Sequence, residues 1–270
     1  MAEQRGRLVF CRGIWYNEVY ETVRSPRRGE DRTGQLQEGG SVVSFSDFFH
    51  HLDWQGMLWM LVQILAVLLC LTVHETCHGL AAYLLGDPTA KRMHRLSFNP
   101  LRHIDPFGAL MMLVAGFGWA KPVPVDMRYF KHPKSGMALT ALAGPVSNFV
   151  LAYLALCLRA LLITVGYQVE AESVLLIWVI DFLATVAILS VGLGLFNLIP
   201  VPPLDGSKVL GALLPDRIYY TILRYERIGM LLLVVVLWSG ALDGGLVWAR
   251  DGVLDWLARA ASAPFRMLLG

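Results

Sequence analysis

The fold is decided by residues 57–85, which read MLWMLVQILAVLLCLTVHETCHGLAAYLL. Residues 57–73 of this stretch are apolar except for Gln63 and Thr72, and the apolar pattern resumes after a polar group at 74–78. Gly86 and Pro88 then give a helix-stop signal. Because a helix rises about 1.5 Å per residue, roughly 29 residues make a helix of about 43 Å. That length predicts a helix that crosses a membrane with some tilt.

The composition of the whole chain agrees with this prediction. Of the 270 residues, 56% are hydrophobic and 16% are charged, and the mean hydropathy is +0.53. A soluble domain carries about 25% charged residues, so the apolar excess indicates a membrane protein. A net charge of +2 without a basic run argues against a nucleic-acid partner. Four cysteines are too few for a disulfide scaffold.

Further apolar stretches predict the rest of the fold. Three of them are long enough to cross a bilayer, namely 137–165, 175–199 and 228–248. The stretch 107–118 is too short to cross as a helix, so we interpret it as a re-entrant or interfacial segment. The predicted fold class is an all-α polytopic membrane protein with about four transmembrane helices and a short re-entrant strand or loop element.

Polarity and charge divide the chain into three parts. Residues 1–56 are rich in arginine and acids and predict a mobile polar tail, whereas residues 57–250 hold the apolar core. Residues 251–270 space arginines among apolar side chains, which indicates an amphipathic or interfacial segment. Lys and Arg gather in the segments 87–134 and 208–227, and the positive-inside rule places both segments in the cytoplasm.

His74, Glu75 and His78 form a His-Glu-x-x-His pattern on the first apolar helix. A spacing of four residues puts both imidazoles on one helix face, close enough to bind one metal ion, and Glu75 can reach a water beside that ion. Ionisable groups are costly inside a membrane helix, at about 2.5–3.5 kcal/mol for a central charge. The alternative, two core histidines beside a buried acid, is therefore disfavoured.

A catalytic zinc site usually has three protein ligands and one water, so the histidine pair lacks one ligand. The candidates in the rest of the chain are His94, His103, Asp105, Glu170, Asp181 and Asp205. Asp105 precedes a proline and is typical of a turn or cap. Asp181 is more typical of a polar group paired within the bundle, with Arg159 as a candidate partner. Asp205 follows the proline-rich break at 200–203, which can line a cavity, and it leads the candidates while the others stay open.

Six short motifs follow one another along the chain. They are HETCHG at 74–79, GDPTA at 86–90, NPLRHIDPFG at 99–108, GFGWAKPVPV at 116–125, AGPVSN at 143–148 and NLIPVPPLDG at 197–206. In this order they resemble the site-2 protease family of intramembrane zinc metalloproteases, especially its short bacterial branch. The resemblance covers roughly residues 61–213.

This resemblance implies a role for each matching residue. Zn²⁺ would be bound by His74, His78 and Asp205. Glu75 would be the catalytic acid and base, and Asn197 would contact the substrate or the developing oxyanion. The segment 116–119, with Gly116 and Gly118, would be the family's re-entrant strand loop and would pair with an unwound substrate segment. Asn148 would line the active site.

Two features depart from the family pattern. No stretch is long enough for the PDZ or CBS domain that many relatives carry, so we do not expect such a module to control substrate access. His94 stands where a small residue is expected.

The resemblance also implies the activity and its setting. We expect regulated intramembrane proteolysis, in which single-pass transmembrane proteins or signal-peptide remnants are cut within or near the bilayer. The enzyme would be a multi-pass protein of the bacterial cytoplasmic membrane, and the sequence does not fix its oligomeric state. Two other functions stay open, a zinc-binding membrane transporter and a catalytically inactive membrane scaffold. The absence of an internal repeat argues against the first, and the intact Glu75 argues against the second.

Overall fold

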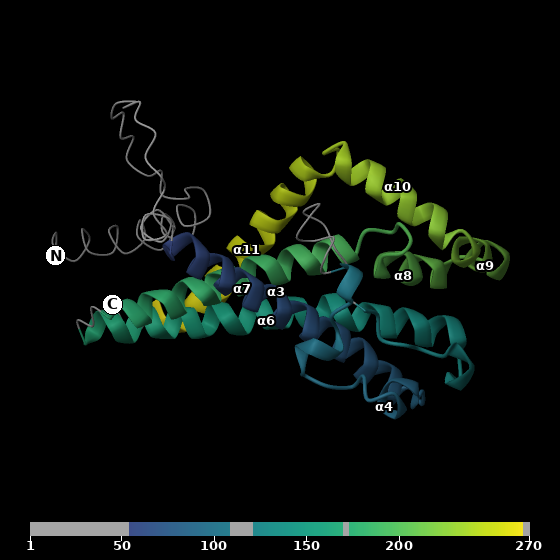
Figure 1. Ribbon diagram of the computed structural model, residues 1–270, viewed down its shortest axis with the longest axis horizontal. Coiled ribbons are helices and arrows are strands. Elements are labelled where there is room, and N and C mark those ends of the chain that lie inside the picture. Colours follow the sequence, from purple (N-terminus) through teal and green to yellow (C-terminus); the bar gives the residue numbers. More distant parts are fainter. Residues whose placement is uncertain (1–53, 109–120, 170–172, 267–270) are drawn as a thin grey trace, which may run out of the picture.

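The computed structural model describes residues 54–108, 121–169 and 173–266. Three long helices dominate this part of the chain, namely α3 (Trp54–Leu84), α6 (Pro133–Gln168) and α7 (Val174–Asn197) (Figure 1). All three are long and apolar enough to span a membrane, and the described ranges hold no β-strand. The chain is therefore an all-α polytopic membrane protein, as the sequence predicts. The expected tail at 1–56 lies almost wholly outside the described residues, and so does the expected loop with Gly116 and Gly118.

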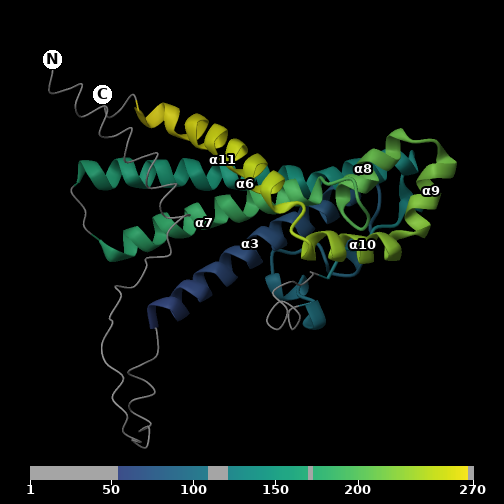
Figure 2. The ribbon, with the colours of Figure 1, turned by 90° about the horizontal axis from the view of Figure 1, so that it is seen from above.

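Shorter helices fill the connections. They are α4 (Thr89–Arg92), η1 (Pro100–Arg102) and η2 (Met127–Tyr129) between α3 and α6, and α8 (Asp205–Leu213), α9 (Asp216–Arg224), α10 (Glu226–Trp238) and α11 (Asp243–Arg266) after α7. Figures 1 and 2 show α4, α8 and α9 at one end of the bundle formed by α3, α6 and α7. The described parts of the two basic segments, 87–134 and 208–227, therefore lie at the same end.

The three long helices pack through small side chains. The buried core includes Ala152 and Ala155 of α6 beside Val186, Ala187 and Val191 of α7. Because lipid is as apolar as these side chains, burial gives helices little reason to associate, and close van der Waals contact must hold them together. Small residues allow that close approach. Cys70 of α3 joins the same core, where its thiol is 3.7 Å from the carbonyl oxygen of Val186.

The stretch expected as a fourth span, 228–248, forms parts of two helices instead of one. A turn at 239–242 separates α10 from α11, and Gly240 adopts φ +68° there, a left-handed conformation that glycine accepts without a steric penalty. The 13 residues of α10 reach about 20 Å, which is shorter than a hydrocarbon core of about 30 Å. In the described part of the chain, three helices rather than four meet the criteria for a span.

The C-terminal helix α11 lies along α6 and α7 (Figure 2). Its Leu257 and Ala261 are buried in the bundle core, while the charged pair Asp255 and Arg259 lies on the exposed side. The expected amphipathic segment 251–270 is thus, as far as residue 266, the second half of a helix that packs on the bundle.

Candidate metal centre

His74, His78 and Asp205 converge between α3 and the beginning of α8. Asp205 Oδ2 lies 3.2 Å from His74 Nε2 and 3.1 Å from His78 Nε2, and the two Nε2 atoms are 3.0 Å apart. All three side chains are buried. Within the described residues, these three side chains could hold a metal ion. We call His74, His78 and Asp205 the metal-binding group.

The proline-rich break brings Asp205 to the histidines. α7 ends at Asn197, and the prolines at 200, 202 and 203 lack the N–H that a continuing helix needs. The chain then turns and starts α8 at Asp205. Gly206 makes this fold possible, because a Cβ at that position would lie 2.2 Å from the Leu198 carbonyl oxygen. A side chain there would push α8 away from the end of α7.

Gly144 of α6 makes room for both imidazoles. A Cβ on Gly144 would lie 2.4 Å from His78 Cε1 and Nε2 and 2.7 Å from His74 Cε1. Such distances are far below van der Waals contact, so any larger residue would displace the histidines. The motif at 143–148 therefore needs a glycine at position 144, because α6 comes very close to the metal-binding group there.

Polar groups on α6 orient the two rings. His78 Nδ1 lies 2.7 Å from the Thr140 carbonyl oxygen, so Nδ1–H donates there and Nε2 remains for the metal. His74 Nδ1 lies 3.2 Å from the side-chain amide of the fully buried Asn148. The Oδ1 atom of Asn148 has no hydrogen-bond partner among the described residues. Turning this amide by 180° lets Oδ1 accept from His74 Nδ1–H, which again leaves Nε2 for the metal.

The donor set fits a zinc ion. Two imidazoles and one carboxylate form a common ligand set of catalytic zinc. Ligand atoms about 2.0–2.1 Å from a tetrahedral ion lie about 3.3–3.4 Å from one another, close to the 3.0–3.2 Å observed here. Burial would raise the pKa of the Asp205 carboxyl, but the adjacent imidazoles of His74 and His78 and the nearby charge of Lys208 hold this pKa well below its usual range. Asp205 is therefore a carboxylate, the form that binds a cation.

Glu75 stands beside the metal-binding group without belonging to it. Its Oε2 accepts a hydrogen bond from the backbone N–H of Val123 at 3.0 Å. Its Oε1 has no hydrogen-bond partner among the described residues. One carboxylate oxygen is thus fixed by the backbone, and the other can take and give a proton.

Most of the other candidate ligands lie elsewhere. His103 is buried, with Nε2 2.7 Å from the Ser97 carbonyl oxygen. Asp105 caps a turn, since its Oδ1 accepts from the N–H groups of Phe107 and Gly108. Asp181 lies in α7 outside the metal-binding group, and Glu170 is outside the described residues. Four of the candidates lie within the described residues, and none of them joins His74 and His78. These four are His94, His103, Asp105 and Asp181.

His94 and Asn197 have specific local surroundings. His94 has φ +55°, a left-handed conformation that favours glycine, which explains why a small residue is expected there. Asn197 ends α7, and its Nδ2 donates to the Leu193 carbonyl oxygen at 3.0 Å. The structure therefore ties the Asn197 amide to its own helix, with the second amide hydrogen left for another acceptor.

Sequence reasoning missed the contacts made by backbone atoms. The Thr140 carbonyl and the Val123 N–H leave no side-chain signal. A signal did exist for Val123, because it stands between Pro122 and Pro124, which have no N–H. Val123 is therefore the only N–H donor among these three residues.

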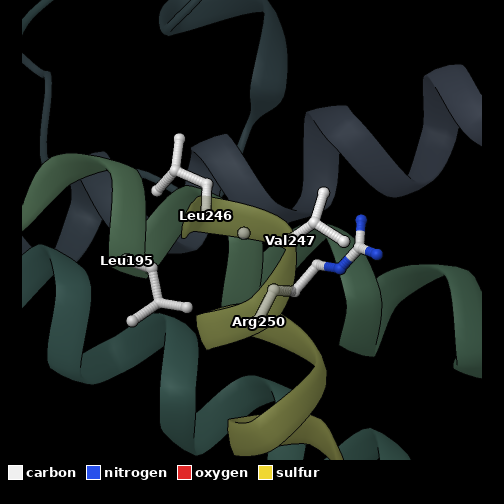
Figure 3. A pocket seen from close by; sticks show the side chains of 5 residues that line it. Leu195, Leu246, Val247 and Arg250 are labelled. Carbon is white, nitrogen blue, oxygen red and sulfur yellow. The ribbon is translucent and has the colours of Figure 1, made fainter. Parts of the chain in front are cut away.

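A small cavity of about 150 Å³ lies between α7 and α11. Figure 3 shows Leu195 of α7 and Leu246, Val247 and Arg250 of α11 around it, and Gly192 completes its lining. None of these residues belongs to the metal-binding group. The cavity is a packing feature of the bundle and not part of the candidate site.

The fold and the site together define a helical membrane protein with a buried His-His-Asp group and an adjacent glutamate. The family model of Peptidase family M50 matches residues 62–239, so the chain belongs to this metalloprotease family, the site-2 proteases. The family resemblance of the motifs is thereby confirmed, and the chain is an integral membrane protein.

The curated relatives are bacterial proteins. The chain is 36% identical over 217 residues to the Bacillus subtilis strain 168 protein named "Putative zinc metalloprotease YwhC", covering 76% of this chain and 93% of that protein. It is 27% identical over 211 residues to the Mycolicibacterium smegmatis protein named "Putative zinc metalloprotease Rip2", covering 76% of this chain and 77% of that protein. No solved structure matches the chain significantly.

Proposed function

We propose that this metalloprotease is an intramembrane zinc endopeptidase that cuts transmembrane substrates within or near the bilayer. One observation carries the proposal. The ligand atoms of His74, His78 and Asp205 lie 3.0–3.2 Å from one another among membrane-spanning helices, with Glu75 on the same helix as the histidines. The family and the names of its relatives support zinc as the metal and proteolysis as the reaction.

The residues of the site divide the chemical work. His74, His78 and Asp205 would hold the zinc, which when bound would supply a Lewis acid and lower the pKa of water to about 7. Glu75 Oε1 takes a proton from the attacking water and later gives it to the leaving amine. The Val123 N–H holds Oε2 throughout, so the carboxylate keeps its orientation while it changes its protonation.

Asn197 is our proposed donor to the oxyanion. Its Nδ2 uses one hydrogen for the Leu193 carbonyl, and the second can stabilise the charge that develops on the scissile carbonyl oxygen. Asn148 contacts the Nδ1 atom of His74 and sets the orientation of the imidazole.

The proposed substrates are single-pass transmembrane proteins or signal-peptide remnants. A transmembrane helix hides its carbonyl groups in internal hydrogen bonds, so the substrate must unwind before hydrolysis. Helix-breaking residues near the cleaved bond lower the cost of unwinding. Pairing of the unwound segment with the segment that contains Gly116 and Gly118 would lower it further.

The decisive experiment compares the wild-type protein with Glu75→Gln in liposomes that contain a single-pass substrate. The glutamine keeps the size of the side chain but cannot carry the proton, so cleavage should fall by about 10²–10⁴-fold. The zinc content should stay at the wild-type level, because Glu75 is not a ligand. Substrate fragments are measured by mass spectrometry and zinc by atomic spectroscopy.

Each alternative function gives a different result in the same liposomes. Zinc flux that survives Glu75→Gln, without any fragment from the wild type, would identify a transporter. Substrate binding without cleavage by the wild type would identify a scaffold. Either result would refute the proposed peptidase.

A further inference from the structure

A short extended segment passes directly beside Glu75. We call residues 121–126 (KPVPVD) the strap. The strap lies against α3, since a Cβ on Gly79 would be only 3.2 Å from Val123 Cγ1. Val123 is buried, and its N–H is the donor to Glu75 Oε2. The position of the strap therefore decides where the proposed catalytic carboxylate points.

Both ends of the strap are held by side chains of the preceding loop. Asp87 is fully buried and accepts the Asp126 N–H at 2.7 Å with Oδ2, while its Oδ1 accepts the Thr89 N–H at 2.9 Å. At the other end, Arg95 Nη2 donates to the carbonyl oxygens of Lys121 at 2.6 Å and of Pro122 at 3.3 Å. Arg95 is 9% exposed.

Arg95 holds backbone carbonyl groups and no acid. Its Nη1 donates to the Arg102 carbonyl oxygen. One guanidinium therefore contacts two carbonyls of the strap and one carbonyl of the preceding loop. In the described part of the chain, no carboxylate lies within ion-pair distance of it. A buried cation is costly without an anionic partner, and carbonyl oxygens only partly compensate. This placement is what we expect of a residue that fixes backbone geometry.

One peptide group links Arg95 to Glu75. The carbonyl of Pro122 and the N–H of Val123 belong to the same planar unit, and in a trans peptide they point in opposite directions. The guanidinium is on the oxygen side of this unit and the Glu75 carboxylate is on the hydrogen side. Hydrogen bonds in such a chain polarise and strengthen one another. Any rotation of the unit away from Arg95 also turns the N–H away from Glu75.

We propose that Arg95 is a positioning residue for Glu75, acting through the peptide group between Pro122 and Val123. The proposal rests on the proposed function, because it assigns the proton transfer to Glu75. Arg95 touches neither the metal ligands nor the reacting atoms. Its loss therefore changes the orientation of the carboxylate and leaves the metal in place.

The experiment measures kcat, KM and zinc content of the full-length protein in liposomes. Arg95→Gln should lower kcat by about 10- to 100-fold, the usual cost of losing an outer partner of a catalytic site, with KM and zinc content unchanged. Arg95→Lys should recover only part of kcat, since a single ammonium cannot reach three carbonyls. Arg102→Ala is the matched control, because Arg102 Nη1 donates to the His94 carbonyl in the same loop and makes no contact with the strap.

A double-variant cycle separates positioning from a general structural role. Replacing the amide between Pro122 and Val123 by an ester removes the N–H and keeps the Val123 side chain. If Arg95 acts through this N–H, Arg95→Gln should have little further effect on kcat in the ester protein. Independent effects that multiply would overturn the proposal, and so would an Arg95→Gln protein that loses zinc or keeps the wild-type kcat.

The same series distinguishes this inference from the proposed function. Glu75→Gln is measured first. If it still cuts the substrate, the assignment of Glu75 fails and the inference fails with it. If Glu75→Gln is inactive with zinc bound while Arg95→Gln has the wild-type kcat, the proposed function stands and only the inference is wrong.

Discussion

The two ends of the bundle are built from the same helices but are held together differently. At the end with the basic loops, α3 and α6 meet through His78 and Thr140, through His74 and Asn148, and through the bare backbone of Gly144. Further along the bundle, the contacts are those of apolar side chains, such as Ala152 of α6 and Val186 and Val191 of α7. Polar contacts have one geometry, whereas apolar packing tolerates changes that conserve volume. The first end should therefore respond sharply to substitution and the second only mildly.

The largest effect is expected at Asp205. Asp205→Ala removes one of the three proposed ligands, so zinc affinity should fall by more than about 100-fold, beyond the cost of losing an outer partner. Cleavage should be lost with it. Titration with a competing chelator measures the affinity. Asp181→Ala is the control in α7 and should keep zinc; zinc loss in this control but not in Asp205→Ala would reverse our ligand assignment.

Gly144→Ala tests the close approach of α6. The added methyl would lie 2.4 Å from His78, so the histidines must move and zinc affinity should fall by about 10- to 100-fold. Gly192→Ala is the matched control in the other part of the bundle, because a Cβ there meets nothing within 4 Å. Its effect on stability should stay within about 0.5 kcal/mol. Equal zinc affinity in both variants would contradict the comparison.

Asn148→Ala tests the support of His74. Without the amide, the ring loses the partner of Nδ1, and zinc should bind about tenfold more weakly. The neighbouring Ser147 is the control, because its hydroxyl donates to the Gly144 carbonyl of its own helix. If Ser147→Ala weakens zinc as much as Asn148→Ala does, the effect comes from α6 and not from the contact with His74.

Val191→Ala should have the smallest effect on the metal centre. It removes two methyl groups from a fully buried position of the apolar core, which should cost about 1–2 kcal/mol of stability. Zinc affinity and kcat should not change. Thermal unfolding in detergent gives the first quantity. A loss of zinc in this variant would show that the apolar packing and the metal centre are coupled, which contradicts the difference between the two ends of the bundle.

The long helices can be predicted from the sequence because each is marked by a local run of mainly apolar residues. An apolar run such as 57–85 needs no partner to be recognised, and the spacing of His74 and His78 fixes their common face. The same local reading merged α10 and α11 into one span, since the apolar content of 228–248 outweighs the turn at Gly240. Where a short apolar helix stops is decided by packing as well as by composition.

The contacts that complete the site are not local. Asp205 lies 131 residues from His74 in the chain, and its prediction from the residues alone competed with five other side chains. The carbonyl of Thr140 belongs to the backbone, which every residue possesses, so no residue type marks it. The N–H of Val123 is marked only by the prolines on either side of it. The role of Arg95 can be inferred only from the structure, which places the strap between Arg95 and Glu75.

The place of the histidines along α3 has a consequence for hydration. His74 lies seventeen residues after Met57, where the apolar stretch begins, and an upright helix advances about 26 Å over that length. α3 ends at Leu84, ten residues and about 15 Å beyond His74. The proposed reaction centre is thus nearer to the end of the helix where the basic loops gather than to the other end. Water therefore has the shorter path to it from the side of the basic loops.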